Sequence, residues 1–429
     1  MATILVESGN LGYTSVDGVL FNSDMTTLIQ CPAGLSGTYS IPDSVTTIGR
    51  EAFGNCHSLT SIGIPDTVTT LGDWAFFHCD GLTRITLPQR VDSIGSYAFE
   101  GCRRLTTFTI PASVTRIETG AWDGCTALTA ILVDTGNTAY SSRDGVLFDA
   151  SFTILLRYPI GLSGSYVIPG GVSTIADHAF QNCKQLTTLT IPDGVTMIGD
   201  SAFQNCTALI ALTIPGSVTT IGDRAFQNCG ELTSVTIPPS ITRIGESAFR
   251  DCRRLGNALF LGDAPLLGSG AFRNTASSSR TDPGFTIYHL AGSSGFPTPT
   301  WDEKPTVSID LEVHPAAPWL LTHTLPYDSD LDLDLNGNGV SLLLAYALDL
   351  DPNMNLAGSM PIARMGPDTM SISFYGERPG ISYTVEFSDD MMTWDKDRVT
   401  LSEPDASGYR TATIDRDSPR RFLRLLVNQ

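Results

Sequence analysis

Residues 191–252 read IPDGVTMIGDSAFQNC, TALIALTIPGSVTTIGDRAFQNC and GELTSVTIPPSITRIGESAFRDC. The same pattern returns every 23 residues, so that Cys206, Cys229 and Cys252 stand at equivalent places. A fixed period of this length is typical of a solenoid, in which each repeat buries its apolar face by stacking on its neighbours. The stretch therefore predicts a repeat protein, whose function is to be sought on a surface rather than in an active-site cleft.

A second, longer period joins these 23-residue rungs into larger units. Residues 13–49 recur as residues 140–176, which lie 127 positions later. Each copy begins with a predicted β-hairpin, which four rungs follow. We therefore expect a solenoid over residues 1–290, made of two superrepeats (about 13–133 and 140–259) and a C-terminal cap.

Each rung changes its hydrophobic period in a fixed order. Residues 232–237 alternate with period 2 over their second half, which predicts a strand with its apolar side chains inward. Pro238 ends this strand, and residues 240–244 form a second, shorter extended piece. Residues 246–249 are expected to make about one helical turn. A rung is thus predicted to be a strand plus a short helical turn, and the fold class to be mainly β.

Eight of the nine cysteines occupy one position of the rung. They are Cys56, Cys79, Cys102, Cys125, Cys183, Cys206, Cys229 and Cys252. Equivalent side chains in stacked rungs point in the same direction, whereas a disulfide needs two side chains that point at each other. The spacing favours a ladder of free, buried thiols, and the lack of a CxxC or Cys/His cluster argues against a metal site.

The rest of the chain follows a different pattern. Residues 291–306 are rich in Gly, Ser, Pro and Thr, which predicts a linker. In residues 307–429 the 23-residue period is absent. A short helix is expected at 342–350, with strands at 371–375, 382–387, 409–414 and 421–427. These elements predict an acidic loop and a short helix, followed by a small antiparallel β-sandwich-like domain.

The rung pattern LTxxTIPxSVTxIGxxAFxNC resembles the leucine-rich repeats of BspA-like, or Treponema-type, bacterial surface proteins. The resemblance covers residues 4–288. It implies a right-handed leucine-rich-repeat solenoid, export to the cell surface or exterior, and a role in adhesion or protein binding. Residues 332–348 and 383–394 are similar to segments of the C-terminal β modules of exported bacterial proteins.

Charge and hydropathy exclude several partners. The chain has a net charge of −19, which repels phosphate backbones and argues against nucleic acid. No apolar run reaches the ~20 residues of a membrane span, and no secretion signal opens the chain. Residues 4–10 match residues 131–137, so the chain begins inside a repeat. We therefore expect a trimmed form of a secreted or cell-surface protein, whose signal peptide is not present in this chain.

The exposed face of the longer strand is the candidate ligand-binding surface. Threonine is frequent there, although it is also an ordinary residue of exposed strands, and the row is too interrupted for an ice-binding array. The candidate ligand-binding residues are Arg84, Thr86, Thr107, Thr109, Thr188, Thr190, Thr213 and Thr236.

A calcium site is the sharpest chemical hypothesis for the tail. Alternating acidic and amide side chains with glycines can wrap oxygen ligands around a hard cation. The candidate ligands are Asp332, Asp334, Asn336 and Asn338. Both registers of such a loop lack the bidentate carboxylate at position 12, so a solvated acidic loop is the competing interpretation.

The sequence contains no HExxH, GxSxG or Walker motif, so no enzyme is predicted. We expect a binding or adhesion protein that presents an extended solenoid surface to a protein ligand, such as a host or extracellular-matrix protein. One alternative is a glycan-binding module, which exposed aromatic side chains on one face would favour; the strand faces offer few beyond Phe108. The other alternative is an accessory portion of a larger exported enzyme.

Overall fold

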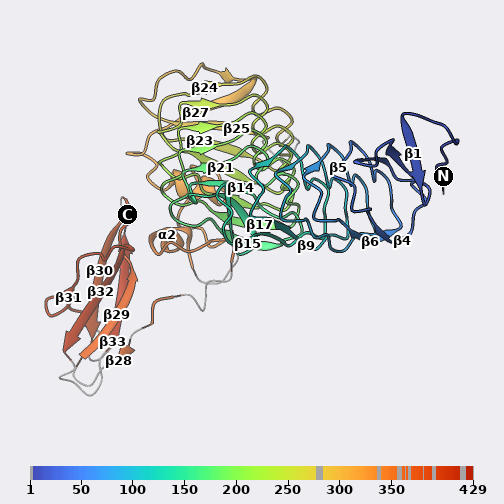
Figure 1. The fold of residues 1–429 in the computed structure, drawn as a ribbon. Coiled ribbons are helices and arrows are strands. Elements are labelled where there is room, and N and C mark those ends of the chain that lie inside the picture. Colours follow the sequence, from blue (N-terminus) through green and yellow to red (C-terminus); the bar gives the residue numbers. More distant parts are fainter. Residues whose placement is uncertain are drawn as a thin grey trace. The chain divides into compact units, whose positions relative to one another are not determined.

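The computed structural model describes residues 3–276, 284–335, 340–354, 360–362, 364–365, 369–379, 381–388, 393–415 and 422–428. The chain divides into two compact units. The first comprises Met1–Ile287 with Ser293–Thr306, and the second comprises Tyr288–Gly292 with Val307–Gln429. The first unit is a solenoid of stacked rungs (Figure 1), and the fold class expected from the 23-residue period is confirmed.

Both superrepeats open with an antiparallel hairpin, after which each rung contributes short parallel strands. The first contains β1 (Tyr13–Val16), β2 (Val19–Asn22), β3 (Thr27–Gln30), β4 (Gly37–Ser40), β5 (Thr47–Ile48), β6 (Leu59–Gly63), β7 (Thr70–Leu71), β8 (Ser93–Ile94), β9 (Thr107–Ile110), β10 (Arg116–Ile117) and β11 (Ala130–Val133). The second contains β12 (Tyr140–Arg143), β13 (Val146–Asp149), β14 (Ile154–Arg157), β15 (Gly164–Val167), β16 (Thr174–Ile175), β17 (Leu186–Thr190), β18 (Met197–Ile198), β19 (Ala211–Leu212), β20 (Thr220–Ile221), β21 (Ser234–Ile237), β22 (Arg243–Ile244), β23 (Asn257–Phe260) and β24 (Leu266–Leu267).

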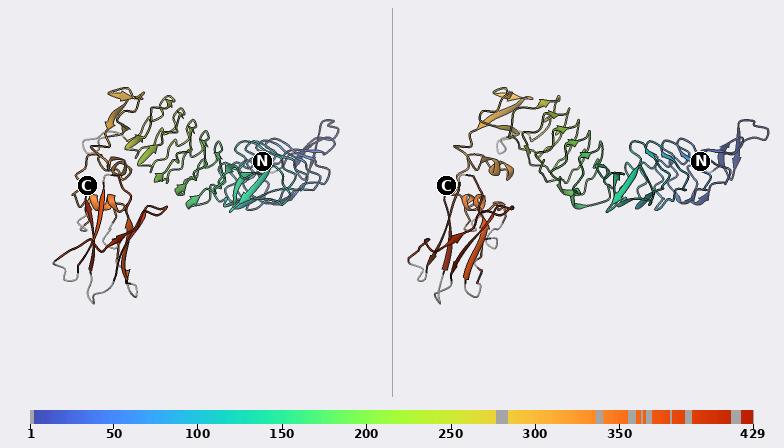
Figure 2. Two further views of the ribbon diagram at one scale, coloured as in Figure 1. Left: turned by 90° about the vertical axis from the view of Figure 1, so that its left-hand side faces the viewer. Right: turned by 60° about the vertical axis from the view of Figure 1, so that its left-hand side comes forward.

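Two sets of strands run along the solenoid (Figure 2). The short strands pair continuously, in the order β3-β5-β7-β8-β10 in the first superrepeat and β14-β16-β18-β20-β22-β24 in the second. The longer strands form separate groups, which include β4-β6, β9-β11, β15-β17-β19 and β21-β23. The shorter extended piece of each rung is therefore the more continuous ladder, although the longer piece carries the clearer strand pattern.

The corner of each rung differs from the single helical turn that its sequence predicts. In the rung at 222–229, the amide of Ala225 closes a turn onto Gly222 O, and that of Phe226 donates to Ala248 O in the next rung at 2.7 Å. Arg224 and Asn228 adopt left-handed backbone conformations, with φ of 55° and 60°. Successive amides thus bond alternately within the rung and between rungs. A helix would keep all its hydrogen bonds local, whereas this corner adds a third ladder between rungs.

Phenylalanine rings form a stacked column in the core of each superrepeat. Phe203, Phe226 and Phe249 are fully buried, and successive ring centroids lie 5.1 Å apart with nearly parallel planes. Because the sequence repeats once per rung, each phenylalanine lies next to the equivalent phenylalanine of the neighbouring rung. The column of rings therefore follows directly from the sequence repeat.

The cysteines form a second column, as the spacing predicts. All nine are free and buried. The thiols of the eight cysteines at the equivalent rung position donate to main-chain carbonyls of earlier rungs, for example Cys206 Sγ to Phe180 O at 3.2 Å. Burial also raises the pKa of the Cys183 thiol from 9.0 to about 12. These cysteines therefore act as small buried side chains with a satisfied S–H donor.

Arg157 fastens the second superrepeat to the first. This residue is the last of β14, and its side chain is 10% exposed. Its guanidinium bonds the Asp123 carboxylate of the first superrepeat at 2.7 Å and the His178 carbonyl of the second at 2.7 Å. The equivalent residue of the first superrepeat is Gln30, so this ion pair is particular to the junction.

Residues 293–306 of the expected linker are folded as part of the first unit. β26 (Thr300–Trp301) pairs antiparallel with β27 (Lys304–Ile309). The rings of Phe296 and Trp301 pack against Phe260 in the last rungs, with centroids 5.4 and 5.3 Å away. The composition of residues 293–306 suggests a linker. Instead, the two aromatic side chains cover the end of the hydrophobic core, which every solenoid must shield from solvent. β25 (Thr286–Leu290) precedes this hairpin.

The second unit combines two short helices with antiparallel strands. Its elements are α1 (Ala317–Thr322), α2 (Leu342–Ala347), β28 (Arg364–Met365), β29 (Thr369–Tyr375), β30 (Ser382–Ser388), β31 (Thr400–Leu401), β32 (Tyr409–Asp415) and β33 (Phe422–Asn428). The strands form two sheets, in the orders β28-β29-β32-β31 and β30-β33. Ile372 and Val385, one from each sheet, share a core cluster. Antiparallel pairing of the four long strands agrees with the sequence pattern.

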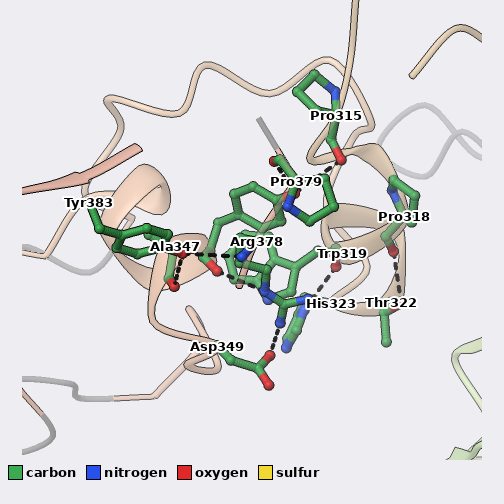
Figure 3. Close-up of polar contacts among 11 residues, drawn as sticks. Pro315, Pro318, Trp319, Thr322, His323, Ala347, Asp349, Arg378, Pro379 and Tyr383 are labelled. Carbon is green, nitrogen blue, oxygen red and sulfur yellow. Dashed lines mark hydrogen bonds and ion pairs between the residues drawn. The ribbon is translucent and has the colours of Figure 1, made fainter. Parts of the chain in front are cut away.

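Arg378 connects α2 to the strands of this unit (Figure 3). Its Nε donates to the carbonyl of Tyr346 in α2 at 3.1 Å, and its guanidinium also pairs with Asp349. The hydroxyl of Tyr383 in β30 donates to Ala347 O at 2.7 Å. Burial lowers the pKa of Arg378 and raises that of Tyr383 to about 12. The polar groups in this cluster satisfy one another, so it holds the unit together.

Candidate ligand-binding surface

The longer strands carry the candidate residues in parallel rows on their exposed side. Because parallel strands pair with a shift of one rung, residues 23 positions apart lie side by side. Thr188 faces Ala211 across β17 and β19, and an isolated bridge joins Thr213 to Thr236. Thr188, Thr190 and Thr213 are exposed and Thr236 is half-buried. The structure thus gathers these four threonines on one face of the second superrepeat.

The other four candidates lie close together in the first superrepeat. Arg84, Thr86, Thr107 and Thr109 all line one hollow of about 420 Å³. Arg84 and Thr86 are exposed, and the two threonines of β9 are half-buried. In Figure 1, β4, β6 and β9 lie along one edge of the rungs, and this hollow belongs to the same edge.

The hollow has defined ends. At one end, the amide of Thr106 donates to Thr83 O at 3.3 Å. At the other, the side chain of Gln89 donates to the Asp134 carboxylate at 2.6 Å and accepts from the amide of Ala112 at 3.3 Å. Between these ends the main chain of residues 84–87 belongs to no strand of the described ladder.

Gln89 and Asp134 also belong to this surface, although neither residue is part of the threonine rows. Both residues line the hollow, and both interrupt the repeat, because the equivalent residues of the second superrepeat are Gly216 and Leu261. A comparison of the two superrepeats position by position was the signal that could have found them.

Phe108 does not support a glycan-binding face. It is an aromatic residue of the strand segments, and its side chain is fully buried. Its ring packs between Phe99 and Trp122, with centroids 4.9 and 5.1 Å away. The expectation that it adds an exposed ring to the strand face is therefore wrong, because odd and even residues of a strand point to opposite sides and position 108 points inward.

The candidate calcium ligands are only partly within the described residues. Asp332 and Asp334 are exposed. Asn336 and Asn338 lie outside the described residues. In the described part of the chain, no group of three or more His, Cys, Asp or Glu side chains is arranged to hold a metal ion. The calcium site remains a hypothesis from sequence.

Comparison with known proteins identifies the repeat. The model of the BspA type leucine rich repeat region matches residues 36–143 and 163–279, in six copies. These residues make up more than half of the chain. The chain belongs to the BspA-type leucine-rich repeat family. The resemblance that the rung pattern carries is thereby confirmed.

Solved structures of similar chains are bacterial leucine-rich repeat proteins. A leucine rich cell surface protein from Faecalibacterium prausnitzii A2-165 is 27% identical with a TM-score of 0.46, over 64% of this chain and 97% of that chain. The pneumococcal vaccine antigen PcpA is 22% identical with a TM-score of 0.49, over 67% and 86%. A leucine-rich repeat protein from Eubacterium ventriosum ATCC 27560 is 26% identical with a TM-score of 0.46, over 59% and 84%.

No curated protein sequence matches the chain. Within the described residues, neither helix has the length and apolarity that a membrane crossing requires.

Proposed function

We propose that this chain is a non-enzymatic adhesion protein, which presents the exposed face of its longer strands to a protein ligand at or outside a bacterial cell. The proposal rests on one observation: rows of polar side chains are exposed on that face, directly above the buried apolar side chains of the core. Leu189 and Leu212 are nearly buried, while Thr188, Thr190 and Thr213 beside them are exposed.

Such a face suits recognition of a large partner. The ladders between rungs fix the spacing of the side chains, so little conformational entropy is lost when a partner binds. Many weak contacts then add up over an extended, rigid surface. The family, whose relatives include cell-surface proteins, supports the location that we propose.

The test is to screen the full chain against immobilised extracellular proteins and a glycan panel, and then to challenge each retained ligand with two variants. Thr213→Glu places a charge on the strand face. Thr219→Glu places the same charge elsewhere in the same rung, where Thr219 is also exposed.

We expect a protein ligand to be retained, and its binding to weaken with Thr213→Glu more than with Thr219→Glu. Retention of glycans alone, or equal effects of the two variants on every protein ligand, would contradict the proposal.

A further inference from the structure

The hollow in the first superrepeat lies where a β-ladder is open. The main chain of Arg84–Leu87 makes no hydrogen bond to β6 or β9 in the described part of the chain, although these strands lie in the rungs before and after it. Extended residues between two parallel strands ordinarily use their amides and carbonyls in the ladder. Here these groups have no ladder partner and lie beside the hollow.

The opening is confined to one edge of the rungs. The short strands β8 and β10 of the same two rungs still pair, Ser93 with Arg116. The corner ladder is also intact, because the amide of Phe99 donates to Ala121 O at 2.9 Å. The rungs are therefore in contact along two ladders, and along the third they are separate over residues 84–87.

On the β9 side of the opening, Phe108 is larger than its counterparts in other rungs, while β9 itself still pairs with β11, Phe108 with Ile131. The neighbouring rungs have isoleucine at the equivalent inward position (Ile85 and Ile131), and the second superrepeat has Val235. The larger ring of Phe108 is packed against Phe99 and Trp122. In a core with native packing density, such extra volume is accommodated by off-rotamer side chains or by moving the backbone, and here the ladder is open on the side of Ile85.

The second superrepeat is an internal control for this explanation. With Val235 in place of Phe108, the corresponding segment keeps part of its ladder, although β19 and β21 belong to separate sheets. β17 pairs with β19, and Thr213 bridges Thr236. The charge is different as well, because Ala211 stands where the first superrepeat has Arg84. The segment without ladder hydrogen bonds and its cation thus occur together in the first superrepeat, whereas the second superrepeat has a partly paired segment and an alanine.

Arg84 determines the chemistry of the occupant. Its side chain is exposed at the hollow and has no carboxylate or carbonyl partner among the described residues. An arginine fork binds a carboxylate through two parallel N–H donors. The amides and carbonyls of residues 84–87 complement the backbone of an extended peptide, which is how peptides add to open sheet edges.

We propose that this hollow binds an extended peptide segment with one acidic side chain, whose carboxylate pairs with Arg84 while its backbone bonds to residues 84–87. The hydroxyls of Thr86, Thr107 and Thr109 contact the flanking side chains. The inference rests on the proposed function, and it names the part of the partner that the chain recognises.

The test is to select a displayed library of random ten-residue peptides on the full chain and then to measure the recovered peptides against three variants. Arg84→Ala removes the cation from an exposed site. Phe108→Val installs the residue of the second superrepeat and leaves the surface side chains unchanged. Arg104→Ala is the matched control, because Arg104 is also an exposed arginine of the first superrepeat.

We expect the recovered peptides to share one Asp or Glu and to bind Arg84→Ala at least about tenfold more weakly, as loss of a charge-assisted hydrogen bond predicts. Phe108→Val should weaken them similarly, and Arg104→Ala should have no effect. Peptides without an acidic residue, the recovery of no peptides, or unchanged binding to Arg84→Ala would overturn the inference. Arg84→Ala decides the matter even if Phe108→Val folds poorly.

The outcomes separate this inference from the proposed function. If a protein ligand binds through Thr213 but is indifferent to Arg84→Ala, the inference fails and the proposed function stands. If acidic peptides bind at Arg84 but no extracellular protein is retained, the peptide site stands and the adhesion role fails.

Discussion

Replacing Arg157 with glutamine should uncouple the two superrepeats. Glutamine is the residue that the first superrepeat has at this place, namely Gln30, so the backbone can accept it. The substitution leaves the Asp123 carboxylate, only 22% exposed, without its cation. Breaking a buried ion pair costs about 3–5 kcal/mol. Because Asp123 keeps some hydration, we expect about 3 kcal/mol, including the lost hydrogen bond to the His178 carbonyl.

Urea denaturation followed by circular dichroism measures this loss, and hydrogen exchange locates it. A solenoid unfolds as a chain of units whose stability depends on the interfaces between them. The variant should therefore expose the junction before the rest of the solenoid, and its unfolding should broaden or divide into two steps.

The matched control is Arg143→Gln on the same superrepeat. Arg143 lies 4.0 Å from Asp144, and both side chains are largely exposed, so we expect a loss below about 1 kcal/mol. Adding Asp123→Asn to Arg157→Gln should restore part of the stability, because no buried charge then lacks a partner. Equal effects of Arg157→Gln and Arg143→Gln would refute the reasoning.

Four further predictions concern the core, the cap and the tail. Because the pKa of Cys183 is raised, the folded chain holds the thiol proton more tightly than the unfolded chain. The contribution of Cys183 to the free energy of unfolding is therefore intact below pH 9 and is lost between about pH 9 and 12. Urea denaturation at several pH values across this range tests the prediction. Phe226→Ala should cost about 3–5 kcal/mol in the same assay, because the ring is fully buried between two others, and a loss below about 1 kcal/mol would contradict the column. Trp301→Ala should destabilise the last rungs in hydrogen exchange while the first superrepeat is unaffected. For the tail, a thermal midpoint unchanged by calcium or chelator would favour the solvated acidic loop, and a calcium-dependent rise would support ligands at Asp332 and Asp334.

The sequence was sufficient to predict the features that every rung shares. A 23-residue period forces equivalent residues into equivalent surroundings, so the buried phenylalanines and free thiols could be inferred without a structure. The threonine rows followed from strand alternation in the same way.

The features that the sequence did not predict depend on single side chains or on hydrogen bonds between rungs. The local sequence of each corner suggests a helical turn. A local pattern cannot reveal that alternate amides bond to the next rung. The hairpin near Trp301 looks like a linker because its composition hides two packed aromatic rings. The hollow depends on the volume of Phe108, whose aromatic character suggested an exposed surface residue.

Hydrogen exchange at the open ladder tests the central claim most directly. The segment 82–88 should exchange its amides faster than the equivalent segment 209–215 of the second superrepeat, because the first lacks ladder hydrogen bonds. When a retained protein ligand is added, exchange in 82–88 should slow. Equal protection of the two segments in the free chain, or protection by the ligand only elsewhere, would contradict the account.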